Sequence, residues 1–252
     1  MRSRLVGVSL KLYLGYADTE AWLAKVASTV ADDRLFVLPS APALPAARRL
    51  LDGTGVRYGA QNVHYAESGP FTGEISATMV AELGGTLCEV GHAERREHFG
   101  ETDEIVARKM TAIARAGLTP VLCVGERDPG PGAEKFVRGQ IRAALTGFPA
   151  AAPLIVAYEP VWAIGAERPA DPAHVARATA LIRRELAGAG RARARVLYGG
   201  SAGAGTFTAL ARAAATPDEL PDGLFLGRSA HDVSRLAGIT EEIFTSGEDA
   251  HE

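Results

Sequence analysis

The segment AYEPVWAIG, residues 157–165, continues an apolar run that starts at Leu154 and is typical of a strand buried on both faces. Glu159 stands at the C-terminal end of this strand, where a carboxylate faces a site and not a core. Pro160 ends the strand, the next four residues are too apolar for an ordinary solvated loop, and Gly165 supplies a flexible joint. We interpret the segment as a strand, a functional carboxylate and a lid. The alternative is a surface carboxylate followed by a loop packed on the wall of the domain.

Similar apolar runs recur along the chain, and most are separated by amphipathic stretches with helical spacing. The predicted strands are residues 5–9, 35–38, 56–60, 86–90, 120–124, 154–158, 195–197 and 223–226. The clearest predicted helices are residues 18–30, 103–116, 133–145 and 172–186. Uninterrupted apolar runs indicate strands covered on both faces, and helical connections indicate parallel pairing.

Eight strand–helix units in 252 residues match the number that closes a (β/α)8 barrel, so we predict an α/β fold of this kind. With 47% hydrophobic residues the chain can build one large core, and we expect a single domain over residues 1–246 followed by an acidic tail, residues 247–252. A doubly wound open sheet is the alternative. Against it, no G-x-G-x-x-G motif follows the first strand, and no shift in composition marks a second domain.

Helix start signals agree with this division of the chain. Asp18, Ser76 and Asp171 are predicted N-caps, the last of them followed by proline at the first helical position. The seventh unit is the hardest to delimit, because residues 203–214 are rich in Gly, Ala and Thr.

The net charge of −3 gives no reason to expect binding to nucleic acid or to an anionic membrane. The first ten residues lack the form of a signal peptide, and no run reaches the roughly 18 apolar residues of a membrane span. The expected location is therefore cytoplasmic. Cys88 and Cys123 lie inside apolar strand-like runs, so we expect reduced core thiols and neither a disulfide nor a metal site.

Polar side chains collect where the predicted strands end, which is the face on which a barrel of this kind carries its catalytic groups. These strand-end residues are Lys11, Gln61, Asn62, His92, Glu94, Arg95, Glu126 and Glu159. Taken singly, each has a structural alternative, such as an ion-pair role for Arg95 or Glu126. Together they supply a carboxylate base, an imidazole and a fixed cation, the set required to abstract a proton next to a carbonyl and to stabilise the enediolate.

Glycines at the last two strand ends supply a second element of the predicted site. Gly199, Gly200 and Ser201 follow the seventh strand, and Gly227 and Arg228 follow the eighth. Barrels often place a phosphate here, bound by backbone N–H groups and a helix N-terminus. The pattern therefore favours a small phosphorylated substrate.

Five segments closely resemble the triosephosphate isomerase family, from one end of the chain to the other. They are AQNVHYAESGPFTGEIS (residues 60–76), EVGHAERREHFGETD (89–103), LCVGE (122–126), AYEPVWAIG (157–165) and LYGGS (197–201). The resemblance implies a TIM barrel in which Glu159 is the base that moves a proton between adjacent carbons, His92 a neutral electrophile, and Lys11 the ammonium beside the developing oxyanion. Glu94 and Ser9 complete the predicted catalytic set. No metal or organic cofactor is implied.

The resemblance also implies a lid and a phosphate cradle. The predicted lid residues are Pro160, Val161, Trp162, Ala163, Ile164, Gly165 and Ala166, which would exclude water and protect the enediolate. The predicted phosphate-binding residues are Gly165, Ser201, Gly227 and Arg228, through their backbone N–H groups.

The resemblance further makes the loop of residues 61–74 a dimer arm, whose Thr72 would reach the active site of a partner copy. Its tip, GPFTG, is apolar and rich in glycine, which suits insertion into a neighbour. The loop could instead fold back on its own barrel. We expect a homodimer.

Four departures from the family lie on the catalytic face. Ser9 stands where the family usually has Asn, Ala93 where it has Ser, AERP (residues 166–169) where it has TGKT, and Arg228 where it has a second Gly. A serine hydroxyl cannot copy the reach of an amide, and the loss of the usual serine at residue 93 removes a hydroxyl that could hold the base in its resting position. The acid, base and cation of the chemistry are retained.

Three functions follow from this pattern. The first is a triosephosphate isomerase that interconverts glyceraldehyde 3-phosphate and dihydroxyacetone phosphate. The second is an isomerase for a related phosphorylated ketose, since a Gly-Arg pair such as Gly227-Arg228 is similar to the branch of the family that acts on erythrulose phosphates. The third is a catalytically weak or silent sugar-phosphate-binding relative, which altered lid and first-strand residues would also suit.

Overall fold

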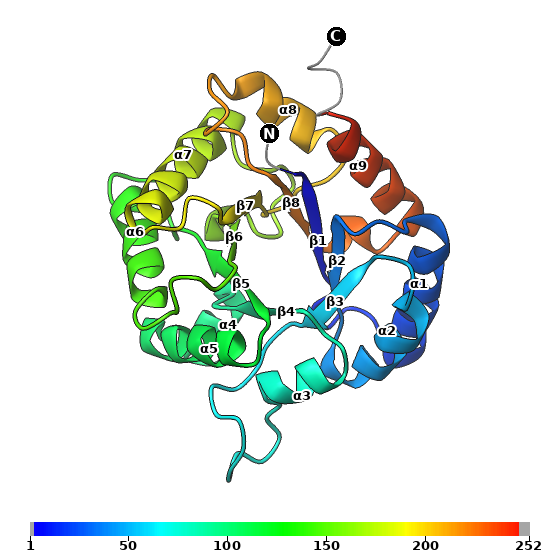
Figure 1. The fold of residues 1–252 in the computed structure, drawn as a ribbon. Coiled ribbons are helices and arrows are strands. Elements are labelled where there is room, and N and C mark those ends of the chain that lie inside the picture. Colours follow the sequence, from blue (N-terminus) through cyan, green and yellow to red (C-terminus); the bar gives the residue numbers. More distant parts are fainter. Residues whose placement is uncertain (1–2, 247–252) are drawn as a thin grey trace.

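The computed structural model describes residues 3–246 of the chain. Eight parallel strands pair in sequence order and close into a barrel, and the helices surround it (Figure 1). The strands are β1 (Leu5–Ser9), β2 (Leu35–Leu38), β3 (Arg57–Ala60), β4 (Leu87–Val90), β5 (Thr119–Val124), β6 (Ile155–Tyr158), β7 (Arg195–Tyr198) and β8 (Gly223–Leu226). Leu5 of β1 pairs with Gly223 of β8, which closes the ring and excludes the open, doubly wound sheet.

Nine α-helices and three short 3-10 helices fall within the described residues. The α-helices are α1 (Tyr16–Thr29), α2 (Leu44–Leu51), α3 (Ala77–Glu82), α4 (Ala93–His98), α5 (Asp103–Arg115), α6 (Ala133–Ala144), α7 (Pro172–Gly188), α8 (Thr206–Ala213) and α9 (Val233–Thr245). The 3-10 helices are η1 (Ala41–Ala43), η2 (Val161–Ala163) and η3 (Arg228–Ala230). None of the helices in residues 3–246 has the length and apolarity needed to cross a bilayer. The predicted acidic tail lies outside the described residues.

Two of the three predicted N-caps are confirmed. The Ser76 side chain accepts a hydrogen bond from the Met79 N–H, and that of Asp171 accepts from the N–H groups of Ala173 and His174. The prediction for Asp18 is wrong, because α1 begins at Tyr16 with Gly15 as its N-cap. Asp18 lies instead within the first turn, where a carboxylate still meets the positive end of the helix dipole.

The barrel has an inner and an outer core, because successive side chains of each strand alternate between its lumen and the helices. The inner cluster includes Phe36, Phe225 and Cys123, and the outer one includes Cys88. Gly7 makes room for the stacked Phe36 and Phe225 rings, since a Cβ there would come within 2.2 Å of Phe36. Both cysteines are buried and free, as predicted.

The loop between β3 and α3 extends away from the barrel at the cyan part of the ribbon (Figure 1). Its base is closed by a bridge between His64 and Ser76, and the rings of His64, Tyr65 and Phe71 pack on one another. The loop is therefore an ordered projection held together by its own side chains.

Candidate active site

Glu159 and His92 face each other across the C-terminal end of the barrel. Glu159 follows β6, His92 follows β4, and both are buried. Glu159 Oε2 lies 3.5 Å from His92 Nε2, too far for a good hydrogen bond, and neither atom has a hydrogen-bond partner within residues 3–246. Buried polar atoms without partners are rare, so this pair is prepared for a bound molecule.

The position of His92 as the N-cap of α4 sets its tautomer. Its Nδ1 accepts a hydrogen bond from the Glu94 N–H at 3.2 Å. An acceptor nitrogen carries no proton, so in the neutral ring the proton sits on Nε2. His92 therefore presents an N–H donor to the place where a substrate oxygen would lie.

Lys11 is fixed beside this pair by Glu94. Lys11 Nζ donates to Glu94 Oε1 at 2.6 Å, and Gln61 holds the turn by donating to the Lys11 carbonyl oxygen at 3.0 Å. Lys11 has a left-handed backbone with φ of 52°, a conformation that costs about 1 kcal/mol or more in a residue other than glycine. Burial acts to lower the pKa of the ammonium, but the bond to Glu94 and the charge of Glu159 outweigh it and raise the pKa. Lys11 therefore stays positively charged.

Ser9 meets a partner that the sequence interpretation missed. Its hydroxyl donates to Glu89 Oε2 at 2.7 Å, and both side chains are 3% exposed. Burial raises the pKa of the Glu89 carboxyl, and the charge of Glu159 raises it further. Glu89 lies in an apolar run and joins Ser9 across 80 positions of sequence, so spacing alone gave no signal. The hydroxyl of Ser9 is thus turned toward Glu89.

All the predicted catalytic and phosphate-binding residues line one cavity of about 510 Å³. They are Ser9, Lys11, His92, Glu94, Glu159, Gly165, Ser201, Gly227 and Arg228. Glu167 of the AERP segment lines it too, as do Tyr13 and Arg235, which the sequence interpretation did not single out. Within the described part of the chain, the backbone N–H groups of Gly165 and Ser201 donate to no protein acceptor. They remain available to an anion.

The lid lies over this cavity and is held by hydrogen bonds to residues at and just after the end of β7. Ser201 Oγ donates to the carbonyl oxygens of Ala163 at 3.0 Å and Ala166 at 2.8 Å. At the far end of the lid, the Ala170 N–H donates to Tyr198 Oη at 2.9 Å. Of the seven predicted lid residues, Ile164, Gly165 and Ala166 line the cavity, whereas Trp162 and Ala163 pack into the protein. The lid thus consists of a short covering segment and an anchor.

Glu126 secures the anchor and does not line this cavity. Its carboxylate accepts from Tyr158 Oη at 3.0 Å and from Trp162 Nε1 at 2.9 Å, and it lies 3.0 Å from His174 Nε2. Arg95 is engaged in the same way, since its Nε donates to Glu101 at 2.8 Å. Arg95 and Glu126 therefore have the structural ion-pair role that the sequence analysis gave as the alternative.

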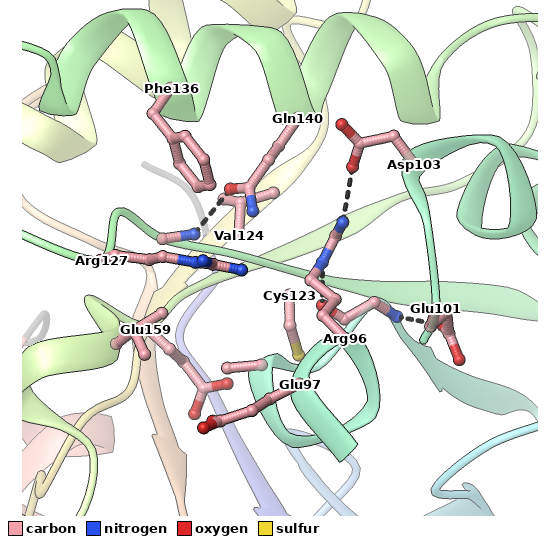
Figure 2. A pocket seen from close by; sticks show the side chains of 14 residues that line it. Arg96, Glu97, Glu101, Asp103, Cys123, Val124, Arg127, Phe136, Gln140 and Glu159 are labelled. Atoms are coloured by element: carbon pink, nitrogen blue, oxygen red, sulfur yellow. Dashed lines mark hydrogen bonds and ion pairs between the residues drawn. The ribbon is translucent and has the colours of Figure 1, made fainter. Parts of the chain in front are cut away.

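A second cavity of about 400 Å³ lies behind Glu159, between α4 and α6 (Figure 2). Its lining includes Ala93, Cys123, Arg127 and Phe136, and Glu159 lines both cavities. The missing hydroxyl at residue 93 thus belongs to this second cavity. In this structure Glu159 directs Oε2 toward His92, on the side of the first cavity.

Comparisons with known proteins agree with the geometry. A family model for triosephosphate isomerase matches residues 4–243. The chain is 41% identical over 263 residues to an L-erythrulose-1-phosphate isomerase of Pectobacterium atrosepticum, covering 97% of each, and 40% identical over 253 residues to one of Rhizobium etli, covering 94% and 91%. It is 44% identical over 191 residues to a triosephosphate isomerase of a Synechococcus strain, covering 74% and 72%.

Proposed function

The chain belongs to the triosephosphate isomerase family and is an isomerase, and we propose that its substrate is a four-carbon ketose phosphate, erythrulose 1-phosphate. In this sugar the carbon next to the carbonyl, on the side away from the phosphate, carries a hydroxymethyl group in place of a hydrogen of the triose. Moving one proton from this carbon to the carbonyl carbon shifts the carbonyl by one position and gives erythrulose 4-phosphate.

Each step has a group in place in the first cavity. Glu159 takes the proton from the hydroxyl-bearing carbon, and the electron pair moves to the carbonyl oxygen. The Nε2–H of His92 donates to that oxygen, and Lys11 stabilises its negative charge. His92 then moves the hydroxyl proton to the former carbonyl oxygen, and the carboxylic acid of Glu159 returns the carbon-derived proton to the neighbouring carbon, so that the former hydroxyl oxygen becomes the new carbonyl oxygen. No atom is gained or lost, and the lid, once closed over the substrate, would keep water from the enediolate.

The single observation that carries the choice of substrate is the orientation of Ser9. A serine side chain has two heavy atoms fewer than the asparagine usual in the family, and its hydroxyl is held by Glu89. A hydroxymethyl group has two heavy atoms, so the space released matches what the larger substrate adds. The two relatives with the broadest coverage named above are both L-erythrulose-1-phosphate isomerases, which supports the same choice.

Arg228 supplies a cation at the phosphate end. Its Nη2 lies 3.8 Å from where a Cβ on Gly165 would be, so the guanidinium stands between the last strand and the lid. An arginine can bind phosphate oxygens by two parallel hydrogen bonds, beyond what the backbone N–H groups of Gly165 and Ser201 offer. We therefore assign Gly165, Ser201, Gly227 and Arg228 to the substrate phosphate.

Triose phosphate isomerisation is the second candidate. The residues that act on the reacting carbons are those that the resemblance to triosephosphate isomerases implies, and one relative of that name is 44% identical. A smaller substrate would leave the space beside Ser9 filled by water. Turnover of the triose would then be measurable but slow.

The reaction is tested by incubating erythrulose 1-phosphate with the protein in D2O and following it by NMR. We expect erythrulose 4-phosphate with deuterium on the carbon that receives the proton, and no product with Glu159→Gln. If the protein binds 2-phosphoglycolate but turns over neither the tetrulose nor the triose phosphate, the proposal is wrong and the chain is a binding protein.

We also propose a homodimer with Thr72 at the interface. Large apolar side chains are exposed on the side where the loops after β1, β3 and β4 lie: Leu12 at 92% exposure, Tyr13, Phe71, Met79 and Phe99. A second copy would cover them, with the projecting loop in the partner's site. Sedimentation should give a mass of twice one chain, and Phe71→Asp should give monomers, whereas a wild-type monomer would contradict the proposal.

The cytoplasmic location predicted from the sequence stays a part of this proposal. The free thiols of Cys88 and Cys123 support it, because thiols persist in a reducing compartment. Fractionation of cells that make the protein tests the location directly.

A further inference from the structure

The opposite end of the barrel carries two inward-facing arginines. Arg57 pairs with Phe36 in the β2–β3 ladder, and Arg195 pairs with Ile155 in the β6–β7 ladder. Phe36 and Ile155 belong to the inner core, and residues paired in a parallel ladder point to the same side of the sheet. Arg57 and Arg195 are the first residues of β3 and β7, which are opposite strands of the ring. Their side chains therefore leave the sheet on its lumen side, and both line one recess at the end remote from Glu159.

Three further arginines surround this pair in a recess of about 1110 Å³. Arg34, Arg191 and Arg193 line it together with Arg57 and Arg195. We call this recess the arginine basin. Asp33 is the single carboxylate in its described lining. A concave surface with an excess of one charge focuses the electrostatic field, and here the excess is positive although the chain has a net charge of −3.

The arginines of the basin differ in how far the protein itself satisfies them. Arg34 forms an ion pair with Asp32, and Arg191 donates to the carbonyl oxygens of Phe148, Pro149 and Ala152. Arg34 and Arg191 therefore have a structural role in the side of the basin.

The other three keep donors for a ligand. Arg57 uses Nε on the Asp33 carbonyl oxygen, and Arg195 uses Nη2 on Ser3 Oγ. Within residues 3–246, Arg193 has neither a hydrogen bond nor an ion pair. Burial lowers the pKa of the Arg57 guanidinium, with Asp33 acting against it, which is the state of a partly desolvated cation short of negative charge.

We propose that the arginine basin binds a triphosphate chain, carried by a nucleoside triphosphate or free in solution. Three guanidinium groups with open donors match the several negative charges and terminal oxygens of such a chain, and arginine pairs with phosphate in a bidentate manner. A recess of this size encloses a compact molecule, whereas a nucleic acid or a membrane surface would need a broad, protruding basic face. The site is separate from the sugar-phosphate cavity, which lies at the other end of the strands.

Calorimetric titration with sodium tripolyphosphate at physiological salt tests the proposal. We expect one site per chain with Kd of about 0.1 mM or tighter, weakening as salt rises. Arg193→Gln should weaken binding about fivefold and Arg57→Gln with Arg195→Gln at least tenfold. Arg193 is exposed, so its substitution does not endanger folding. The matched control is Arg212→Gln on α8, which removes an exposed arginine away from the basin and should leave Kd unchanged.

Competition separates this site from the catalytic one. Saturating 2-phosphoglycolate should not displace tripolyphosphate, and the basin variants should keep the isomerase kcat of the wild type. Titrations with ATP and AMP distinguish the two sources of the triphosphate. If ATP binds more tightly than tripolyphosphate, the ligand is a nucleotide; if the two bind equally and AMP does not bind, the site recognises the triphosphate alone. Displacement by 2-phosphoglycolate, an equal loss in Arg212→Gln, or no binding below millimolar concentration would overturn the proposal.

Discussion

The two sides of the catalytic cavity are built differently. On the proton-transfer side, Lys11 is fixed by Glu94 and His92 by the first turn of α4, so each group has one orientation. On the phosphate side, the Arg228 guanidinium has neither a hydrogen bond nor an ion pair to a described residue; it lies 5.9 Å from the centre of the Tyr13 ring, on a 3-10 turn beside the lid. Groups that perform the reaction need fixed geometry, whereas groups that select a substrate can change without disturbing it. Under the proposed function, this difference would let the barrel keep its proton-transfer chemistry while taking a larger sugar phosphate.

The largest expected effect lies on the proton-transfer side. Glu159→Gln should lower kcat about 10³-fold or more, because an amide cannot accept the proton. The matched control is Glu126→Gln at the neighbouring strand end, which should lower kcat by about tenfold at most through a loosened lid. Steady-state kinetics of both variants make the test. Equal losses would mean that the two carboxylates do not have separate roles.

The next effect concerns the space beside Ser9. Ser9→Asn should lower kcat/KM for erythrulose 1-phosphate about 100-fold, because the amide occupies the volume of the hydroxymethyl group, and should change kcat/KM for the triose less than fivefold. Glu89→Gln serves as the control, since it keeps volume and a hydrogen-bond acceptor for Ser9. A Ser9→Asn enzyme with both values unchanged would remove the basis for the choice of substrate.

A smaller effect is expected on the phosphate side. Arg228→Ala should raise KM about tenfold with little change in kcat, because the cation binds ground state and transition state alike. Arg127→Ala, an exposed arginine of the second cavity, should leave KM unchanged. A large fall in kcat for Arg228→Ala would place this residue among the groups that act on the reacting carbons.

The smallest expected effect is a shift in the pH at which kcat/KM falls on the alkaline side. The partner Glu94 raises the pKa of Lys11, and a raised pKa keeps the ammonium charged to higher pH. The stability that the Lys11–Glu94 pair contributes is fully present below the pKa that Lys11 has in the unfolded chain. It is lost as the pH rises through the higher pKa that Lys11 has in the folded protein. Glu94→Gln should therefore move the alkaline fall in kcat/KM to lower pH. An alkaline limb that stays in place would show that Glu94 does not support the charge of Lys11.

The sequence predicted the fold because its evidence is local. The apolar run at residues 154–158 contains β6, and uninterrupted runs of this kind require covered strands wherever they occur. The start of α1 was misplaced because Asp18 fits an N-cap pattern, while the structure uses Gly15 with no side-chain cap. Helix boundaries depend on such details of a single turn.

The site was predictable to the extent that strand ends converge. That rule placed Lys11, His92 and Glu159 at one cavity, where the structure also has them. It could not find Glu89, whose significance depends on pointing into the lumen beneath Ser9. Nor could it find the arginine basin, because its members come from separate segments and only the barrel register brings Arg57 and Arg195 together.

The most direct test is the ratio of kcat/KM for erythrulose 1-phosphate to that for dihydroxyacetone phosphate, measured on the wild-type protein in one assay. A fixed proton-transfer side with an altered substrate side predicts a ratio of about 100 or more, corresponding to roughly 3 kcal/mol of discrimination. Triose turnover at ordinary enzyme efficiency, about 10⁴ M⁻¹s⁻¹ or more, with the tetrulose phosphate ignored, would contradict it.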